Sequence, residues 1–365
     1  MTGSDGVAAL PVSVYSLEPP ARPRPVVVFG AGGIVHDAHL PAYRRGGLPV
    51  AVIYNRNRAR AEKLAADYGI PVVLDSVADA VTAAPPDAVF DLALMPEQYV
   101  EVLSQLPDHA PVLIQKPLGN DFAAAHAVAQ VCRDKQLVAA VNAQLRFAPY
   151  IQAARTALAQ GRIGELADLE IQVAVHTPWQ LFPHVLDLPR LEINAHSVHY
   201  LDLVRSFLGE PASVSAVSVP RPGATQNTRT EMILHYPQRP LRVVISANHD
   251  HRFGPRYEQS YVKWEGSAGA IRAQLGLLLN YPSGGEDRCE QQLDSDTSRT
   301  WTPIPFRGSW FPDAFIGTMS SLQRYVEGSS PYLPTALEDG MATMALVETA
   351  YASAARGGVP VVSEP

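Results

Sequence analysis

The chain has 365 residues, of which 47% are hydrophobic and 18% are charged, so it is long enough for two globular domains. Its formal net charge of −7 argues against nucleic acid or an anionic membrane surface as the main partner. Only two cysteines are present, Cys132 and Cys289, and their wide spacing argues against a disulfide framework and against a thiolate metal site.

The N-terminal segment, residues 1–24, lacks the basic start and the long apolar core of a signal peptide. We expect it to be a partly flexible leader that ends in the Pro-rich stretch 19–25. The sequence has no apolar run of membrane-spanning length, and we expect a cytoplasmic protein that does not contact a membrane.

Residues 25–145 alternate between short apolar strands and helical segments. This alternation is typical of a doubly wound parallel sheet. Together with the glycine-rich stretch after its first strand, it predicts a dinucleotide-binding Rossmann domain. We expect strands at 25–30, 49–54, 88–95, 111–115 and 137–142, and helices at 36–47, 59–69, 97–106 and 121–135.

The glycine-rich stretch GAGGIVHDAHLPAY follows the first expected strand. Gly30 would allow a tight turn, and Gly32 would let backbone N–H groups approach a pyrophosphate at the helix N-terminus. Gly33 and Ile34 complete the predicted cofactor loop. The third position of the fingerprint, usually Gly or Ala, is Val35 here, so the match is imperfect.

The end of the second expected strand reads VIYNRNRAR. At this point dinucleotide-binding domains usually carry an Asp or Glu that binds the adenosine ribose. This sequence has Asn55 there, followed by Arg56 and Arg58. Guanidinium groups attract a 2′-phosphate and stack on adenine, so the pattern favours NADP slightly over NAD. A solvated basic loop is the alternative interpretation.

From about residue 165 the strands become longer and follow one another with few helices between them. We therefore predict a second domain, residues 146–365, with an α+β fold and a large, mostly antiparallel open sheet. The exposed face of such a sheet commonly needs a partner, which predicts a homodimer or homotetramer. Strands are expected at 165–177, 212–220, 229–236, 241–250 and 261–273, and closing helices at 313–328 and 336–356.

One helix of this second domain carries an unusual set of polar residues in the stretch RLEINAHSVHYLDLVRSFLGEP. Glu192, His196, His199 and Asp202 lie within eleven residues, and the two histidines and the aspartate are three residues apart. They could form a metal site with Glu192, His196 and His199 as ligands, a proton relay, or satisfied polar groups. A fourth metal ligand is not evident in the sequence, so we assign no metal.

Several motifs together resemble the Gfo/Idh/MocA family of NAD(P)-dependent oxidoreductases. They are GAGGIVHDAHLPAY, LIQKPLG with Gln115 in the position of the motif glutamate, VNAQLRFAPY, GRIGELADLEI and PTALEDGMATMALVETAYASAARG. The resemblance covers residues 25–360. It implies a Rossmann domain, a second domain with an open sheet, and a carbohydrate substrate in the cleft between them.

The resemblance also implies functional residues. Lys116 matches the catalytic lysine, which would hydrogen-bond the reacting hydroxyl and stabilise the developing alkoxide. His199 matches the histidine of the Asp-x-Gly-x-His-x-x-Asp motif and is the expected general acid or base. The leading aspartate of that motif falls on Ala195, and we interpret His196 and Glu192 as a replacement for its polar role. Core positions for both histidines, and a surface position for the lysine, are the structural alternatives.

Three further residues are candidates for binding. Asn142 ends a strand and could contact the nicotinamide ribose or amide, and Arg146 could anchor a substrate carboxylate or a loop. Trp179 could form an aromatic wall against a sugar ring or pack in the core.

Together these features predict hydride transfer between NAD(P) and a carbinol carbon of a sugar, polyol or sugar derivative. The alternatives are a non-catalytic NAD(P)-binding sensor, and a lyase or glycosidase that oxidises its substrate transiently.

Overall fold

The computed structural model describes residues 10–181, 188 and 190–359. The chain forms two compact units, one made of Met1–Gly161 with Pro303–Met344 and the other of Arg162–Thr302 with Ala345–Pro365. The first unit therefore contains the predicted Rossmann segment, the helix that follows it and part of the C-terminal region. No helix in the described ranges is long and apolar enough to span a membrane.

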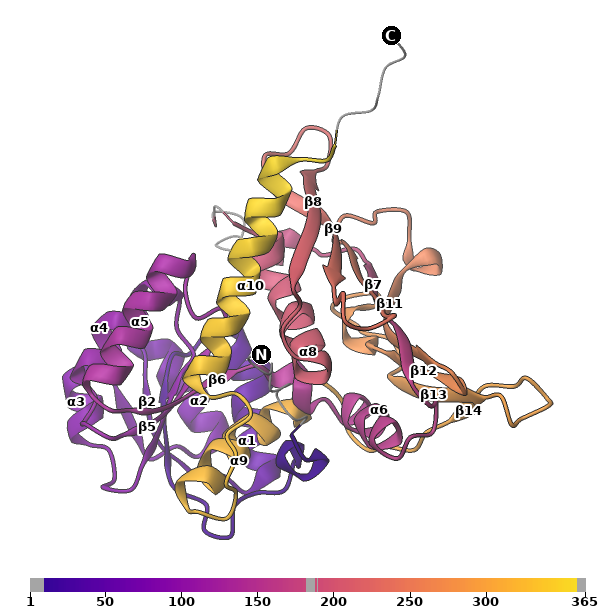
Figure 1. Ribbon diagram of the computed structural model, residues 1–365. Coiled ribbons are helices and arrows are strands. Elements are labelled where there is room, and N and C mark those ends of the chain that lie inside the picture. The colour runs from indigo at the N-terminus through magenta and orange to yellow at the C-terminus, as the bar shows by residue number, and fades with distance from the viewer. Residues whose placement is uncertain (1–9, 182–187, 189, 360–365) are drawn as a thin grey trace, which may run out of the picture. The chain divides into compact units, whose positions relative to one another are not determined.

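The first unit is built on a six-stranded parallel sheet with the order β3-β2-β1-β4-β5-β6. This confirms the predicted Rossmann fold. Figure 1 labels three of its strands, β2, β5 and β6, and the helices around them. The short strand β3 and the short helix after it were missed, because three and six residues carry little periodicity. The strands are β1 (Val26–Phe29), β2 (Val50–Tyr54), β3 (Val72–Leu74), β4 (Val89–Leu92), β5 (Pro111–Gln115) and β6 (Val138–Asn142).

Apolar side chains cover both faces of this sheet, which is why its strands read as continuous hydrophobic runs. Helices α4 (Tyr99–Gln105) and α5 (Phe122–Asp134) pack on one face, and α1 (Leu40–Gly46), α2 (Arg58–Tyr68) and α9 (Asp313–Val326) pack on the other. The remaining helices of this unit are α3 (Val77–Thr82), α6 (Pro149–Ala159) and the start of α10 (Leu337–Arg356).

The described part of the predicted leader contacts the first unit. A 3-10 turn, Val12–Tyr15, places the buried Tyr15 ring 5.5 Å from the Phe147 ring, and the Arg155 guanidinium lies 4.1 Å above it. The backbone N–H groups of Ala21 and Arg22 donate to the Glu327 carboxylate. Residues 1–9 of the predicted leader lie outside the described residues.

The second unit contains an eight-stranded sheet with the order β14-β13-β12-β11-β7-β10-β9-β8. All neighbouring pairs with a determined register are antiparallel except β7 and β10, which confirms the mostly antiparallel open sheet. The strands are β7 (Leu166–Ala174), β8 (Ser213–Pro220), β9 (Asn227–His235), β10 (Arg242–Asn248), β11 (Gln259–Gly266), β12 (Gly269–Gln274), β13 (Arg288–Leu293) and β14 (Thr302–Pro303).

The prediction of a single strand over residues 261–273 is wrong. The chain turns at Ser267 and Ala268, and β11 and β12 pair as a hairpin with Gly266 opposite Gly269. A Cβ on Gly266 would lie 2.3 Å from the Ile163 carbonyl oxygen, so a side chain has no room there. Two apolar runs separated by a short segment that contains glycine, here GSAG, are a hairpin signal that the strand interpretation overlooked.

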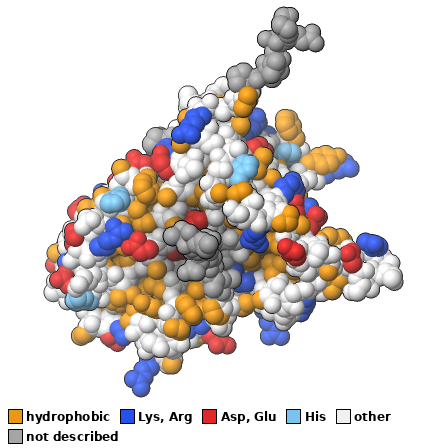
Figure 2. Space-filling model, in the orientation of Figure 1, with side chains coloured by type: hydrophobic (Ala, Val, Ile, Leu, Met, Phe, Trp, Pro, Cys, Tyr) orange, Lys and Arg blue, Asp and Glu red, His pale blue; other side chains and the backbone are white. Residues whose placement is uncertain are grey.

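Helix α8 (Val198–Leu208) contacts one face of this sheet through Phe207, whose ring lies 5.2 Å from the Trp264 ring of β11. Leu201 and Val204 of the same helix are buried. The other face of the sheet carries charged side chains such as Arg242, which pairs with Asp168 and Glu170. Acidic and basic side chains are interspersed on the side of the molecule shown in Figure 2.

Candidate active site

The glycine loop after β1 has the geometry that a pyrophosphate requires. Gly30 has a φ of 121°, and a Cβ at this position would lie 2.4 Å from the Ala93 carbonyl oxygen, so only glycine fits. Gly32 and Gly33 are exposed, and a Cβ on Gly32 would meet no atom within 4 Å. Exposed backbone at the N-terminus of a helix is a suitable site for an anionic group.

The helix after this loop begins with a π-helical turn, Val35–His39, which continues into α1. The half-buried Ile34 precedes this turn, and the turn ends at the fully buried His39. Turns of this type are rare and occur frequently at functional sites, because the extra residue changes the direction in which the following side chains point.

The loop after β2 holds the three residues that we interpreted as the adenosine site. The Asn55 side chain donates to the backbone oxygen of Asn57, which caps α2. Arg58 is exposed but forms ion pairs with Glu62 at 2.9 Å and Asp75 at 3.8 Å. Arg56 is exposed and forms no ion pair with the part of the chain that the structure describes.

Lys116 follows the last residue of β5, at the carboxyl end of the parallel sheet. Its backbone N–H donates to the Gln115 side-chain oxygen at 2.8 Å. The lysine side chain is half-buried, and loss of solvation lowers the pKa of its amine to about 8.

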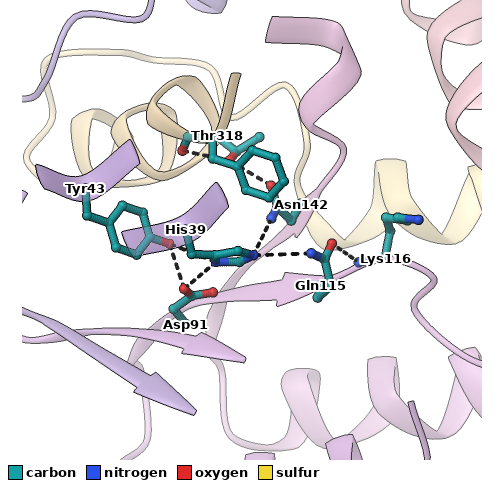
Figure 3. Close-up of polar contacts among 8 residues, drawn as sticks. His39, Tyr43, Asp91, Gln115, Lys116, Asn142 and Thr318 are labelled. Atoms are coloured by element: carbon teal, nitrogen blue, oxygen red, sulfur yellow. Dashed lines mark hydrogen bonds and ion pairs between the residues drawn. The ribbon is translucent and has the colours of Figure 1, made fainter. Parts of the chain in front are cut away.

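A buried polar network lies beside Lys116, and sequence reasoning missed its centre (Figure 3). The His39 Nδ1 atom lies 2.7 Å from Asp91 Oδ2, and the Tyr43 hydroxyl donates to the same oxygen at 2.7 Å. The His39 Nε2 atom lies 3.2 Å from Gln115 Nε2. Two signals were available in the sequence: an acid within the apolar stretch AVFDLALM, and His39 and Tyr43 four residues apart on one helix.

Asn142 belongs to the same network. Its Nδ2 atom lies 3.5 Å from His39 Nε2, and its Oδ1 atom accepts a hydrogen bond from Thr318 at 2.8 Å. The residue is fully buried, so both ends of its amide are occupied within the unit.

Arg146 is also buried within the first unit. Its guanidinium donates to the Pro334 carbonyl oxygen at 2.7 Å and pairs with Asp339 at 2.5 Å. These contacts correspond to the loop-anchoring alternative that the sequence left open.

The second unit brings a different set of polar groups together. A second π-helical turn, Ile193–Ser197, precedes α8 and carries Ala195 and His196. The His196 ring stacks on the His249 ring at 4.3 Å, and the Trp179 ring lies edge-on to His196 at 5.5 Å. His249 follows β10 and was not identified from the sequence, although a histidine at a strand end next to Asp250 was visible there.

Glu192 lies next to the His249 ring of this stack. It is buried, its Oε1 atom accepts a hydrogen bond from Ser197 at 2.7 Å, and the same atom lies 3.6 Å from His249 Nε2. At the other ring nitrogen of His249, the Thr177 hydroxyl lies 3.1 Å from Nδ1. His199 is half-buried on α8, and Asp202 is buried one turn later. Among the residues that the structure describes, no three His, Cys, Asp or Glu side chains form a group that could hold a metal ion.

Comparison with models of known protein families shows to which family the chain belongs. The model of the Gfo/Idh/MocA oxidoreductase family with an NAD-binding Rossmann fold matches residues 24–143, and the model of its C-terminal alpha/beta domain matches residues 155–362. The chain belongs to the Gfo/Idh/MocA family of oxidoreductases. This confirms the resemblance deduced from the motifs and identifies the protein as an enzyme of that family.

Individual relatives are distant. D-apiose dehydrogenase of Rhizobium rhizogenes is 24% identical, and the match covers 85% of this chain and 89% of that protein. 1,5-anhydro-D-fructose reductase of Ensifer adhaerens is 28% identical, and the match covers 52% of this chain and 59% of that protein. A solved oxidoreductase from Agrobacterium radiobacter, in complex with NAD+, L-tartaric acid and magnesium, has a TM-score of 0.75 at 21% identity and covers 92% of this chain and 98% of its own. The structure of levoglucosan dehydrogenase, in complex with NADH and levoglucosan, has a TM-score of 0.72 at 18% identity. The match covers 91% of this chain and 97% of that chain. These two structures support the fold.

The lowered pKa of Lys116 predicts that this lysine destabilises the folded enzyme. Below pH 8 the amine is protonated in both folded and unfolded chains, so the folded chain bears the full cost of enclosing the charge. As the pH rises from 8 towards 10.5, the folded state loses this proton first and the cost disappears. We expect Lys116→Met to raise the free energy of unfolding at pH 7 by about 1–2 kcal/mol, allowing for partial solvent screening.

Urea unfolding of the wild type and Lys116→Met at pH 7 and pH 10 measures this effect. The stabilisation should be smaller at pH 10. The exposed Lys63→Met is the matched control, and it should change stability little at either pH. Equal stability of the Lys116→Met variant and the wild type at pH 7 would contradict the assignment of a desolvated amine.

Proposed function

We propose that the protein is an NAD(P)-dependent oxidoreductase that transfers a hydride between the nicotinamide and a carbinol carbon of a sugar, polyol or sugar derivative. The observation that carries this proposal is the position of Lys116, at the carboxyl end of the sheet whose first strand leads into an exposed glycine loop. In open parallel sheets this edge is where nucleotide ligands and reactive groups meet. The sugar-oxidising or sugar-reducing names of the relatives support the substrate class.

The residues of the loop fit a dinucleotide. Gly30 allows the close turn against Ala93, and the exposed Gly32 and Gly33 leave backbone free to approach phosphate oxygens. Ile34 completes this loop at the start of the helix. The bound nicotinamide would supply the hydride acceptor or donor.

Lys116 and His199 carry the proposed acid–base chemistry. An amine with a pKa of about 8 can donate a hydrogen bond to the reacting hydroxyl and stabilise the alkoxide that develops on oxidation. His199 would take the hydroxyl proton, directly or through water, and return it in reduction. The proposal requires both residues, which belong to different compact units, to act on the same oxygen.

His196 has a supporting role in this proposal. Its ring is held by the stacked His249 and by the edge of Trp179, so its orientation is fixed within the second unit. Trp179 is buried against these two rings, and any contact with a sugar would use the part of the indole that stays exposed.

A non-catalytic NAD(P)-binding sensor is the second candidate function. The observation that favours it is Ala195, which stands where the family motif has a carboxylate. Glu192 does not restore a carboxylate at the surface, because it is buried beside Ser197 and His249.

We further propose that the enzyme is cytoplasmic and forms a dimer or tetramer through the open sheet. The outer face of β8 and β9 exposes Val217, Val219 and Ile233, an apolar group of the kind that a second subunit covers.

The central test follows the absorbance of the reduced cofactor with a panel of sugars and polyols, with product analysis in parallel. We expect substrate-dependent turnover, and a loss of at least ~100-fold in Lys116→Ala with cofactor binding retained, because an alkoxide stabiliser contributes a few kcal/mol to the transition state. Lys63→Ala is the control. A Lys116→Ala variant with more than half the wild-type rate would disprove the role of Lys116.

Two other outcomes of the same assay would replace the proposal. Cofactor binding without turnover of any compound would favour the sensor. Product formation without net cofactor reduction would favour a lyase or glycosidase that oxidises its substrate transiently.

The second test concerns the cofactor, for which we propose a modest preference for NADP. Arg56→Ala should weaken NADP by about tenfold and NAD much less, since a guanidinium–phosphate contact is a charge-assisted hydrogen bond. Arg58→Ala is the matched comparison and should have a smaller effect, because Glu62 and Asp75 already pair with this side chain. Titration calorimetry with both cofactors measures the dissociation constants. Tighter wild-type binding of NAD would reverse the preference.

The third test separates the two histidines of the second unit. His199→Asn should be slow and nearly independent of pH in the neutral range, because the group that exchanges the proton is lost. His196→Asn should be milder, because its role is to support the site. Single-turnover rates across pH compare the two variants. A severe His196→Asn variant beside a mild His199→Asn variant would mean that His196 is the acid or base.

A further inference from the structure

The orientation of the Gln115 side chain determines which nitrogen of the buried His39 carries a proton. The backbone N–H of Lys116 can only donate, and it lies 2.8 Å from one end of the Gln115 amide, so that end is the oxygen. The NH2 group of Gln115 therefore points at His39 Nε2, 3.2 Å away (Figure 3). Because an NH2 group donates, His39 Nε2 must accept.

The other contacts of the imidazole agree with this assignment. The NH2 group of Asn142 approaches the same Nε2 atom at 3.5 Å, while the Asn142 oxygen is occupied by the Thr318 hydroxyl. On the opposite side, Nδ1 lies 2.7 Å from Asp91 Oδ2, and an ionised carboxylate can only accept. His39 is therefore a neutral imidazole with its proton on Nδ1.

Asp91 and Tyr43 hold this tautomer. Burial, and secondarily the neighbouring Asp91 carboxylate, raise the pKa of the Tyr43 phenol well above its ordinary value, so the hydroxyl stays a donor to Asp91. The side chains of His39 and Asp91 have no exposed surface, so water does not compete for these hydrogen bonds. The Phe315 ring packs 4.9 Å from the imidazole and limits its rotation.

The backbone of Gln115, the residue before Lys116, is also held by a hydrogen bond. The buried Tyr99 hydroxyl donates to the Gln115 backbone oxygen at 2.7 Å. The Gln115 side chain is held between His39 and the Lys116 amide. Hydrogen bonds therefore hold both the backbone and the side chain of Gln115 at the point where β5 leads to Lys116.

We propose that His39, kept in the Nδ1–H form by Asp91, is a positioning residue for Lys116 and acts through Gln115. This inference rests on the proposed function, since it matters for the reaction only if Lys116 acts on the substrate oxygen. His39 does not exchange a proton in the reaction. It provides the acceptor that fixes the Gln115 amide, and that amide fixes the backbone of the lysine.

Two substitutions of His39 separate this role from simple packing. The terminal amide of Gln reaches the place of Nε2, so His39→Gln can still accept from Gln115. The shorter amide of Asn reaches only the place of Nδ1, so His39→Asn keeps the contact with Asp91 but loses the acceptor for Gln115. Both variants lose the ring that packs on Phe315, and only His39→Asn keeps the contact with Asp91, so His39→Asn should not be the less stable of the two.

The experiment measures kcat, KM and cofactor dissociation constants of the full chain with a substrate found in the sugar panel. We expect His39→Gln to keep kcat within about threefold of the wild type, and His39→Asn to lower kcat by about tenfold or more with KM and cofactor binding little changed. The exposed His126→Asn is the control and should behave as the wild type. Equal kcat values for the two His39 variants would overturn the proposal.

A second set of variants does not depend on His39. Gln115→Leu keeps the volume but removes the amide, so it should lower kcat as His39→Asn does. The double variant His39→Asn/Gln115→Leu should lose no more than either single change, because both break the same connection. Additive losses would contradict a shared role. The exposed Gln105→Leu is the matched control and should leave kcat unchanged.

Nitrogen-15 NMR of the imidazoles tests the tautomer without an activity measurement. The wild-type signal that disappears in His39→Gln should come from a neutral ring protonated on Nδ1. A ring protonated on Nε2 or on both nitrogens would overturn the inference.

The proposed function and the positioning role of His39 are contradicted by different results. A fast Lys116→Ala variant removes the proposed function and leaves the NMR result unaffected, whereas equal His39 variants beside a slow Lys116→Ala variant remove only the positioning role.

Discussion

The hydrogen bond from His39 to the buried Asp91 connects the helix that follows the glycine loop to the centre of the parallel sheet. Asp91 lies on β4, which pairs with β1 on one side and β5 on the other. Through Gln115 the same imidazole reaches the end of β5, and through Asn142 it reaches the end of β6. A single buried ring therefore connects the segment expected to bind the cofactor with the strand that precedes Lys116.

Such a network is costly unless its polar groups are satisfied, because each buried polar group has lost its hydration. Most atoms of this network have partners, but Asp91 Oδ1 has no hydrogen-bond partner among the described residues. The carboxylate is thus held through its other oxygen, which accepts from both His39 and Tyr43. The concentration of donors on one oxygen gives the imidazole a defined tautomer as well as a defined position.

Both compact units use a π-helical turn to place a histidine. Val35–His39 ends in the His39 of the first network, and Ile193–Ser197 carries the His196 that stacks on His249. In each unit a second layer of buried groups supports the ring: Asp91 and Tyr43 in the first, and His249 and Glu192 in the second. Two of the positions that depart from the family motifs, Gln115 and Ala195, lie in these two places.

The sequence by itself determined the fold class, the family and the chemistry-bearing segments, because these depend on local patterns. Alternating buried strands and helices predicted the parallel sheet, which the structure confirms. The glycines after β1 and the LIQKPLG motif predicted a cofactor loop and a role for Lys116, and both stay predictions. Only the tertiary structure decided which side chains meet. Asp91 and His39 are 52 residues apart, and Glu192 and His249 come from a helix and a strand end with no shared periodicity. A π turn shifts the side chains after it out of the 3.6-residue period, so helical spacing alone could not place His39 or His196 among their partners.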